Sequence, residues 1–422
     1  MRDRGETTPS VAVVRGGTVR GWHAGRLGSR RRTCNKVCVL DRSASTGTRR
    51  GRLLELAALF GLLGIIGFGG PAAHVALIRR EVVERRRWMA EQRFVDLLGV
   101  TNLLPGPNST ELAMHVGLDR AGRAGLVVAG TAFILPAALI VGLLAALYVA
   151  AGPSPVAASL LYGIKPVIIA IVGVAIMQLG RTALAGPLRA LIGVAVGALA
   201  LLGVHELALL AGGALLMAGT RGGLDRSRDW LARSLLAVST AGAALAATAV
   251  SLPVLFATFL KIGATLYGSG YVLVAFLRAD FVDRLGWITD RQLIDAVAIG
   301  QVTPGPLFTT ATFVGYLVAG PLGALVATIG IFLPAFLLVA LAGRLAARLR
   351  SRPLTAALLD GVNAAAIGLM AAVTIELGGD AIVDPLTAGL ALVSGLLLVL
   401  RVPSAWIVVA GAAVGLARGL IG

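Results

Sequence analysis

The sequence predicts an all-α polytopic membrane protein made of two homologous halves in inverted topology. Three observations support this prediction: 57% hydrophobic against 14% charged residues with a mean hydropathy of +0.86, long segments without charge, and an internal repeat. Soluble domains carry about 25% charged residues, and a soluble core could not hide this much apolar surface. The composition therefore argues against a water-soluble enzyme and against a disordered chain.

Three segments contain neither charged residues nor histidine: Ala124–Ile164, Ser234–Leu260 and Ala296–Gly343. They are 41, 27 and 48 residues long, and a membrane helix needs about 20 apolar residues. Two of the segments therefore hold more than one helix. We expect spans at about 124–146, 155–180, 187–203 and 205–219, and again at 321–343, 354–378, 386–400 and 403–420.

The repeat aligns residues 60–107 with 259–306 without gaps, at an offset of 199, and 13 of the 48 pairs are identical. Trp88 matches Trp287, and the run Pro105-Gly106-Pro107 matches Pro304-Gly305-Pro306. After a one-residue deletion the match continues at an offset of 198, as in Pro136 and Pro334. Two homologous halves in a membrane are typical of transporters.

The positive-inside rule predicts that the halves are inverted. Arg79–Arg93 holds six arginines and its repeat partner Arg278–Gln292 three, whereas Arg344–Arg352 holds four and its partner, 146–154, none. Corresponding loops thus carry opposite bias. Each half makes an even number of crossings, so the extra apolar span 234–251 would reverse the second half and leave the loop Arg221–Arg233 in the cytoplasm.

Four regions follow from this organisation: a basic disordered tail (1–51), a first repeat (52–220), a loop with the inverting helix (221–251) and a second repeat (252–422). Residues 1–50 hold 12 basic and 3 acidic side chains. Such a tail either contacts anionic lipid or precedes the true start codon, and we expect no nucleic-acid partner. Its Cys34 and Cys38 define neither a disulfide framework nor a metal site.

Glycine and proline interrupt four apolar segments, at 53–78, 94–118, 253–277 and 293–317. The interruptions in the first half are Gly69-Gly70-Pro71 and Pro105-Gly106-Pro107. Proline removes a backbone donor and glycine relaxes the dihedral limits. Backbone of this kind at membrane depth must be buried in protein or line a watery cavity. A re-entrant hairpin and a kinked span both fit each segment.

These motifs resemble the chromate ion transporter (CHR) family in its long, two-domain form, over about residues 52–420. The resemblance rests on Phe68-Gly69-Gly70-Pro71, His74, Arg85-Arg86-Arg87-Trp88 and Pro105-Gly106-Pro107-Asn108-Ser109-Thr110. It implies a carrier of the plasma membrane, here the bacterial inner membrane, that exports chromate, is driven by an ion gradient and confers chromate resistance. In the second half Leu273 replaces His74 and Leu307-Phe308 replace Asn108-Ser109, so the first half keeps more of the polar pattern.

Two other functions stay open beside chromate export. A carrier of sulfate or another oxyanion is the nearer one, because these tetrahedral dianions share charge and shape. An intramembrane enzyme would need a nucleophile–base set or a paired acid, which the sequence does not show. We therefore expect no enzyme, no cofactor and no metal, and we expect an oxyanion and the lipid bilayer as partners. A homodimer is left open.

A dianion without an apolar face needs hydrogen-bond donors and positive potential, which helix N-termini provide. We therefore expect the anion where helices restart after the two Pro-Gly-Pro breaks. The candidates are Gly106, Asn108, Ser109 and Thr110 in the first half and Thr309 and Thr310 in the second. Plain N-capping by the same side chains is the alternative.

Lys165 and Lys261 are candidate positive charges for the anion, because each lies inside an apolar segment where an unpaired charge is costly. Snorkelling or pairing with a buried acid is the alternative. His74 and Glu111 are weaker candidates for proton coupling or gating. A hydrogen-bonded packing histidine is the alternative for His74, and Glu111 could instead pair with His115 at i,i+4.

Overall fold

A computed structural model describes residues 48–68, 70–101, 104–152, 154–220, 250–266, 272–350 and 353–421. Every regular element in these ranges is a helix, which confirms the predicted all-α class. Residues 1–47 of the basic tail, with Cys34 and Cys38, the loop Arg221–Arg233 and nearly all of the predicted inverting helix lie outside the described residues. The helix Arg49–Ile66 begins inside the tail predicted for residues 1–51, so the last three tail residues are helical. Residues Gly47–Gly422 form one unit by their contacts.

The two halves contain the same series of helices. The first half has α1 (Arg49–Ile66), α2 (Gly70–Arg79), the π-helical turn η1 (Arg80–Arg85), α3 (Glu91–Thr101), α4 (Asn108–Ala151), α5 (Pro155–Ala183), α6 (Pro187–Leu201) and α7 (Glu206–Gly219). The second has α9 (Leu252–Thr265), α10 (Leu273–Leu277), the π-helical turn η3 (Arg278–Arg284), α11 (Asp290–Val302), the 3₁₀ turn η4 (Leu307–Thr309), α12 (Thr310–Arg350), α13 (Pro353–Ala381), α14 (Pro385–Val399) and α15 (Ser404–Ile421).

Helices end on both sides of all four predicted breaks. In the first half α1 ends before Gly67, and α4 begins directly after Pro105-Gly106-Pro107. In the second half α9 ends at Thr265, and η4 follows Pro304-Gly305-Pro306. The interruptions are therefore true ends of helices. The re-entrant course of these segments remains a prediction.

Two of the helices fold back on themselves, a feature the sequence analysis did not foresee. In α4 the bend lies at Ala121-Gly122, and in α12 at Ala319-Gly320, where the two glycines have φ of 67° and 62°. A Cβ atom on Gly117 would lie 2.2 Å from the carbonyl oxygen of Gly125. Because that contact joins residues eight positions apart, the arms on either side of the bend pack as a hairpin.

The long arms after these bends, 123–151 and 321–350, correspond to the spans predicted at 124–146 and 321–343. With α5 and α13 they belong to the four helices that are long and apolar enough to cross a membrane. The other predicted spans are also helices but shorter, with 15 residues in α6 and 14 in α7. Because about 20 residues are needed to cross, full crossing by these short helices remains a prediction.

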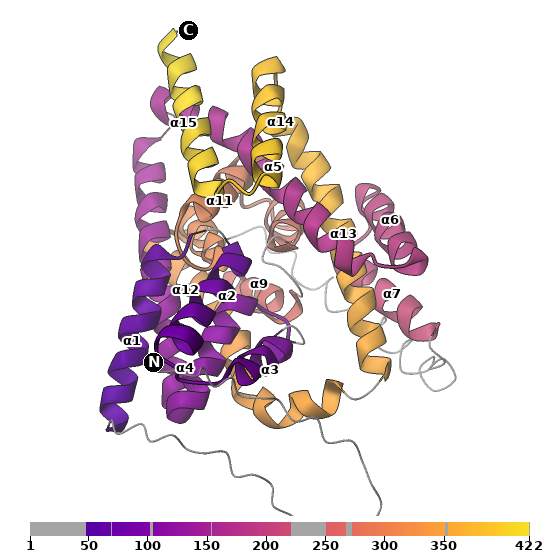
Figure 1. The fold of residues 1–422 in the computed structure, drawn as a ribbon. Helices are drawn as coiled ribbons and strands as arrows, with labels where there is room; N and C mark the ends of the chain where they lie inside the picture. Colours follow the sequence, from indigo (N-terminus) through magenta and orange to yellow (C-terminus); the bar gives the residue numbers. More distant parts are fainter. Residues whose placement is uncertain are drawn as a thin grey trace, which may run out of the picture. The chain divides into compact units, whose positions relative to one another are not determined.

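The halves are interlocked through their C-terminal helix pairs. The helices α14 and α15 pack on α5 of the first half, while α6 and α7 pack on α13 of the second (Figure 1). Glycines permit the close approach: Gly163 of α5 lies against Gly411, and its repeat partner Gly361 of α13 lies against Gly213. Small residues let membrane helices approach at the backbone, so each half completes the packing of the other.

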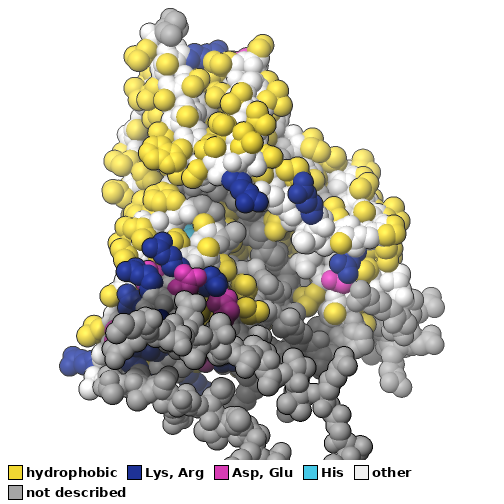
Figure 2. All heavy atoms as spheres, viewed as in Figure 1, with side chains coloured by type: hydrophobic (Ala, Val, Ile, Leu, Met, Phe, Trp, Pro, Cys, Tyr) yellow, Lys and Arg dark blue, Asp and Glu magenta, His cyan; other side chains and the backbone are white. Residues whose placement is uncertain are grey.

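A repeated ion-pair network follows the second helix of each half. Arg79 contacts Glu84 at 2.6 Å and Glu91 at 2.7 Å, and Arg278 contacts Asp283 at 3.2 Å and Asp290 at 2.8 Å. These charged positions correspond in the repeat. Figure 2 shows charged side chains gathered over the α2–α3 region, whereas the surface over α5, α14 and α15 is largely hydrophobic. The network of the first half therefore lies on a polar part of an otherwise largely hydrophobic surface.

Candidate functional site

The two halves meet at their helix breaks through a pair of equivalent hydrogen bonds. The Gly106 N–H donates to the Leu266 carbonyl at 2.7 Å, and the Gly305 N–H donates to the Gly67 carbonyl at 2.8 Å. Gly106 and Gly305 are repeat partners, and so are Gly67 and Leu266. Each Pro-Gly-Pro turn is thus tied to the end of the first helix of the opposite half. Both glycines have positive φ, 143° and 98°, which favours glycine.

A small cavity lies at this crossing. Residues of both halves line it: Pro71, His74, Pro107, Asn108 and Ser109 from the first, and Pro306, Leu307 and Phe308 from the second. The first half supplies its polar side chains, since Leu307 and Phe308 stand where the first half has Asn108 and Ser109. The crossing therefore has a polar and an apolar side.

His74 joins three elements at this cavity and is 2% exposed. Its Nε2 lies 2.8 Å from the Gly67 carbonyl oxygen, and its Nδ1 lies 3.4 Å from the Ser109 hydroxyl. A carbonyl only accepts, so Nε2 carries a proton and donates, and in the neutral ring Nδ1 accepts from the Ser109 hydroxyl. This arrangement matches the packing alternative for His74, which orients Ser109.

The first turn of α4 lines the cavity through Asn108 and Ser109. Pro107 is its N-cap and forms no side-chain cap, and the first amides of a helix lack acceptors within it. The N-terminus also carries about half a positive charge from the helix dipole. Ser109 and Thr110 are buried in this turn, and the Thr110 hydroxyl has no hydrogen-bond partner among the described residues.

Glu111 is fully buried in the same turn. Neither carboxyl oxygen has a hydrogen-bond partner among the described residues, and the same holds for Nε2 of His115. The alternative in which Glu111 pairs with His115 is therefore not formed in this structure. The carboxyl instead lies against the first break, because a Cβ atom on Gly106 would come within 2.3 Å of Oε1.

At the second break, the threonine hydroxyls donate hydrogen bonds to backbone carbonyls of the same turn. The Thr309 hydroxyl donates to the Pro306 carbonyl and the Thr310 hydroxyl to the Leu307 carbonyl, both at 2.8 Å. Both threonines are buried. Hydroxyl bonding to backbone of the same turn is the capping alternative that the sequence analysis left open for Thr309 and Thr310.

Each candidate lysine forms an ion pair with a buried aspartate. Lys165 Nζ lies 3.0 Å from Asp295 Oδ1, and the Tyr148 hydroxyl donates to the other oxygen of Asp295 at 2.8 Å. Lys261 Nζ lies 2.6 Å from Asp280 Oδ1. This is the pairing alternative for both lysines. Asp280 and Asp295 occupy acidic positions of the repeat, and that signal could have identified them as partners.

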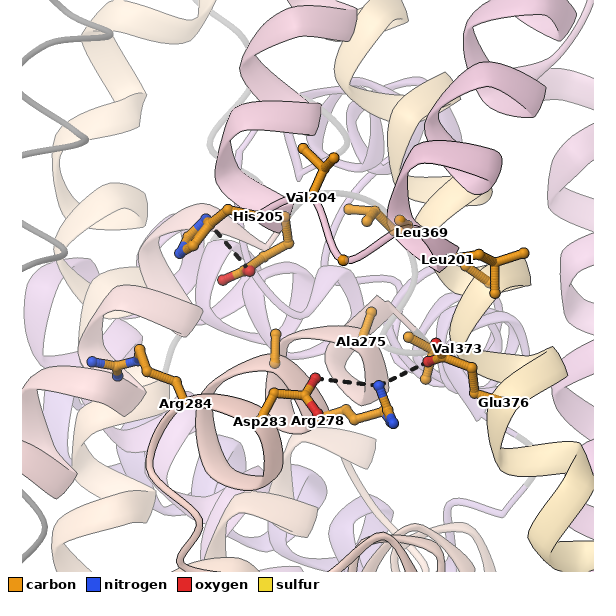
Figure 3. A pocket seen from close by; sticks show the side chains of 15 residues that line it. Leu201, Val204, His205, Ala275, Arg278, Asp283, Arg284, Leu369, Val373 and Glu376 are labelled. Atoms are coloured by element: carbon orange, nitrogen blue, oxygen red, sulfur yellow. Dashed lines mark hydrogen bonds and ion pairs between the residues drawn. The ribbon is translucent and has the colours of Figure 1, made fainter. Parts of the chain in front are cut away.

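A larger cavity of about 450 Å³ lies between the α6–α7 turn, η3 and α13 (Figure 3). Arg278 in its lining contacts three carboxylates, those of Asp283, Asp290 and Glu376. Burial, with Asp290 adding to the effect, raises the pKa of Asp283. Because three lining acids, Glu206, Asp283 and Glu376, face two lining arginines, Arg278 and Arg284, the cavity is electrostatically poorly suited to a dianion. The sequence analysis did not predict it.

Comparison with known proteins identifies the family of this chain. The profile of the chromate transporter family matches residues 54–218 and 253–416, one match in each half. The chain belongs to the chromate transporter family. It is 37% identical to the chromate transport protein of Pseudomonas aeruginosa over 76% of this chain and 80% of that protein. It is 34% identical to that of Cupriavidus metallidurans over 86% of this chain and 92% of that protein. No solved structure matches.

Family membership and the apolar helices establish a multi-pass membrane protein of a transporter family. The two family matches confirm the two predicted halves. Among the described residues no group of three or more metal-ligating side chains comes together. The candidate site is therefore the crossing of the two breaks, where buried polar side chains of α4 meet the turns of both halves.

Proposed function

We propose that this protein is a secondary-active carrier that exports chromate across the plasma membrane and thereby confers chromate resistance. The proposal is supported by family membership and by the chromate transport proteins to which most of the chain is similar. A carrier of sulfate or another tetrahedral oxyanion is the second form of the same proposal, because such anions share charge and geometry.

The crossing of the two breaks is the site that we propose for the anion. The observation that carries this assignment is the N-terminus of α4, where Asn108 and Ser109 line the cavity and the buried Thr110 follows them. Broken helices of transporters direct such ends at anionic substrates. The amides of Asn108 and Ser109 and the hydroxyls of Ser109 and Thr110 would donate to the oxyanion, each bond contributing about 1.5–3 kcal/mol.

The second half has a smaller part in this proposal. Thr309 and Thr310 would have to turn their hydroxyls away from the backbone to donate to an anion. Lys165 and Lys261 would have to be drawn from their aspartates, at the cost of leaving a buried acid unpaired. The cavity is small in this conformation, so the anion enters when the halves separate at the crossing. The Gly106–Leu266 and Gly305–Gly67 hydrogen bonds are the contacts that would open.

Uptake into inside-out membrane vesicles tests the function directly. Vesicles that contain the protein are expected to accumulate radiolabelled chromate when an ion gradient is imposed, and unlabelled sulfate is expected to compete. Cells that express the chain should then retain less chromate and tolerate more of it. Vesicles that take up no more chromate than protein-free vesicles, under any imposed gradient, would contradict chromate as the substrate.

A further inference from the structure

The Glu111 carboxyl is a buried acid for which the described residues provide no counter-charge. It is 0% exposed, and no described residue donates a hydrogen bond to either oxygen. A buried ionised carboxylate without a partner is strongly disfavoured, so such a group binds a proton instead. The structure describes three other buried acids, Glu206, Asp280 and Asp295. Each of them lies within 4 Å of a lysine nitrogen.

The repeat shows what the carboxyl adds at this place. Around Gly305, a Cβ atom would meet Ala137 and the Gly64 carbonyl, so the second break is enclosed by apolar packing and backbone. Around Gly106 the equivalent Cβ would meet Glu111 first and Ala335 after it. The matching position of Glu111 in the second half is a threonine. The first break alone thus has an acid against its turn.

Several titratable groups on the elements packed against α4 are already bonded to other groups. His74 of α2 bonds Gly67 and Ser109, Glu55 of α1 pairs with Arg120, Arg93 of α3 pairs with Asp119, and Asp295 of α11 pairs with Lys165. On α12, residues 310–343 contain no charged residue or histidine, and η4 contains none. His115 lies one turn along α4 from Glu111, and its Nε2 also has no hydrogen-bond partner among the described residues. No described residue donates a hydrogen bond to the Glu111 carboxyl.

We propose that Glu111 is the proton-binding residue that couples proton movement to oxyanion transport. The inference rests on the proposed anion site at the first turn of α4, of which Glu111 is part. A dianion bound beside Ser109 and Thr110 would repel an ionised carboxylate in the same turn, so anion and proton bind together. Linkage is reciprocal: protonation of Glu111 raises oxyanion affinity, and the oxyanion raises the proton affinity of Glu111.

The test measures binding of radiolabelled sulfate and chromate to the purified protein as a function of pH. Wild-type affinity is expected to fall by up to about tenfold per pH unit above the titration of Glu111, since one proton is linked to one anion. Glu111→Gln mimics the neutral acid and is expected to bind at all pH values with the high affinity, while proton uptake into vesicles during transport is lost. Asp96→Asn, at an exposed acid of α3, is the matched control and should keep the wild-type slope.

A folded Glu111→Gln protein that keeps the wild-type pH slope and proton uptake would overturn the proposal. A second measurement needs neither variant folding nor transport. The infrared spectrum of the wild-type protein at neutral pH should contain the carbonyl band of a protonated carboxylic acid, and its absence would also overturn the proposal. If the wild type binds neither anion at any pH but shows this band, the function proposed above fails while proton binding at Glu111 stands.

Discussion

The two helix breaks share one backbone arrangement and differ in chemistry. Each Pro-Gly-Pro turn donates an equivalent hydrogen bond to the opposite half, and each second helix is followed by the same arginine–acid network. Yet the first break continues into Asn108, Ser109, Thr110 and Glu111, and the second into Leu307 and Phe308. The repeat therefore keeps the framework in both halves, while the polar run that we propose for anion recognition directly follows the break only in the first.

The largest difference expected between the halves is their orientation in the membrane. Gln92 and Arg291 are repeat partners and are both exposed. In a protein without Cys34 and Cys38, single cysteines at these two positions should react with a membrane-impermeant reagent from opposite sides. The positive-inside rule predicts that Gln92→Cys is reached from the cytoplasm. Labelling of both from the same side would refute the inverted arrangement.

The Lys165–Asp295 pair has no counterpart in the other half, because the repeat partner of Lys165 is Asn363. Lys165→Gln leaves a buried aspartate unpaired and is expected to lower the free energy of unfolding by about 3–5 kcal/mol, measured by thermal unfolding in detergent. The double variant Lys165→Gln/Asp295→Asn removes both charges and should recover most of that loss.

Chromate transport by the double variant separates the two roles of Lys165. If the lysine only balances Asp295, transport returns with stability. If it also contacts the anion, the stable double variant stays inactive. A double variant that is as unstable as the single one would show that the charge pair is not what the lysine contributes.

Alanine substitutions at Gly106 and Gly305 should show whether the atoms around each turn can move to accept a methyl group. Both have positive φ, so strain of about 1–3 kcal/mol is expected in each. A Cβ on Gly305 would lie 2.5 Å from Ala137 and 3.1 Å from the Gly64 backbone, whereas on Gly106 it meets the end of the Glu111 side chain. Gly305→Ala should therefore lower the unfolding temperature more than Gly106→Ala. The reverse order would contradict the described packing.

The smallest expected effect is on the pH dependence of stability. The pKa shifts of one acid in each ion-pair network, Glu91 and Asp283, have opposite signs. The hydrogen bond from Arg79 lowers the pKa of Glu91, so its stabilising contribution is lost as pH falls through the folded-state pKa. Burial raises the pKa of Asp283, so stability is lost as pH rises from the unfolded-state pKa to the folded-state pKa. In a plot of unfolding free energy against pH, Glu91→Gln should remove part of the loss of stability toward acidic pH. Asp283→Asn should remove part of the loss that occurs as pH rises above the unfolded-state pKa of Asp283. Identical profiles for both variants would contradict these assignments.

Much of the fold could be predicted from the sequence because its signals are local. Charge-free length indicated the helices, and the repeated Pro-Gly-Pro and Trp88 positions indicated two halves and the places where helices end. The exchange of helix pairs between the halves could not be predicted, because it depends on glycine contacts such as Gly163 with Gly411. The position of a glycine in the sequence does not indicate which helix will pack against it. The hairpin at Ala121-Gly122 was missed because a single glycine in an apolar run also fits a straight helix.

The candidate site was predicted in part for the same reason. The structure brings Asn108, Ser109, His74 and the second break to one cavity, as the two motifs suggested. Lys165 and Lys261 stood out only as unpaired charges in apolar segments. Asp295 on α11 lies far from Lys165 in the sequence, and neither lysine recurs in the other half, so the repeat contains no matching pair. The repeated acidic positions of Asp280 and Asp295 were the one signal that pointed to them.

Matched hydroxyl deletions at the two breaks test the central claim most directly. Transport of chromate into vesicles is measured for Ser109→Ala and Thr309→Ala, with surface expression and unfolding temperature as controls. Because a hydrogen bond to a charged ligand contributes about 1.5–3 kcal/mol, Ser109→Ala should lower kcat/KM by about tenfold or more, and Thr309→Ala by much less. Equal losses, or a larger loss for Thr309→Ala, would contradict recognition of the anion by the first break.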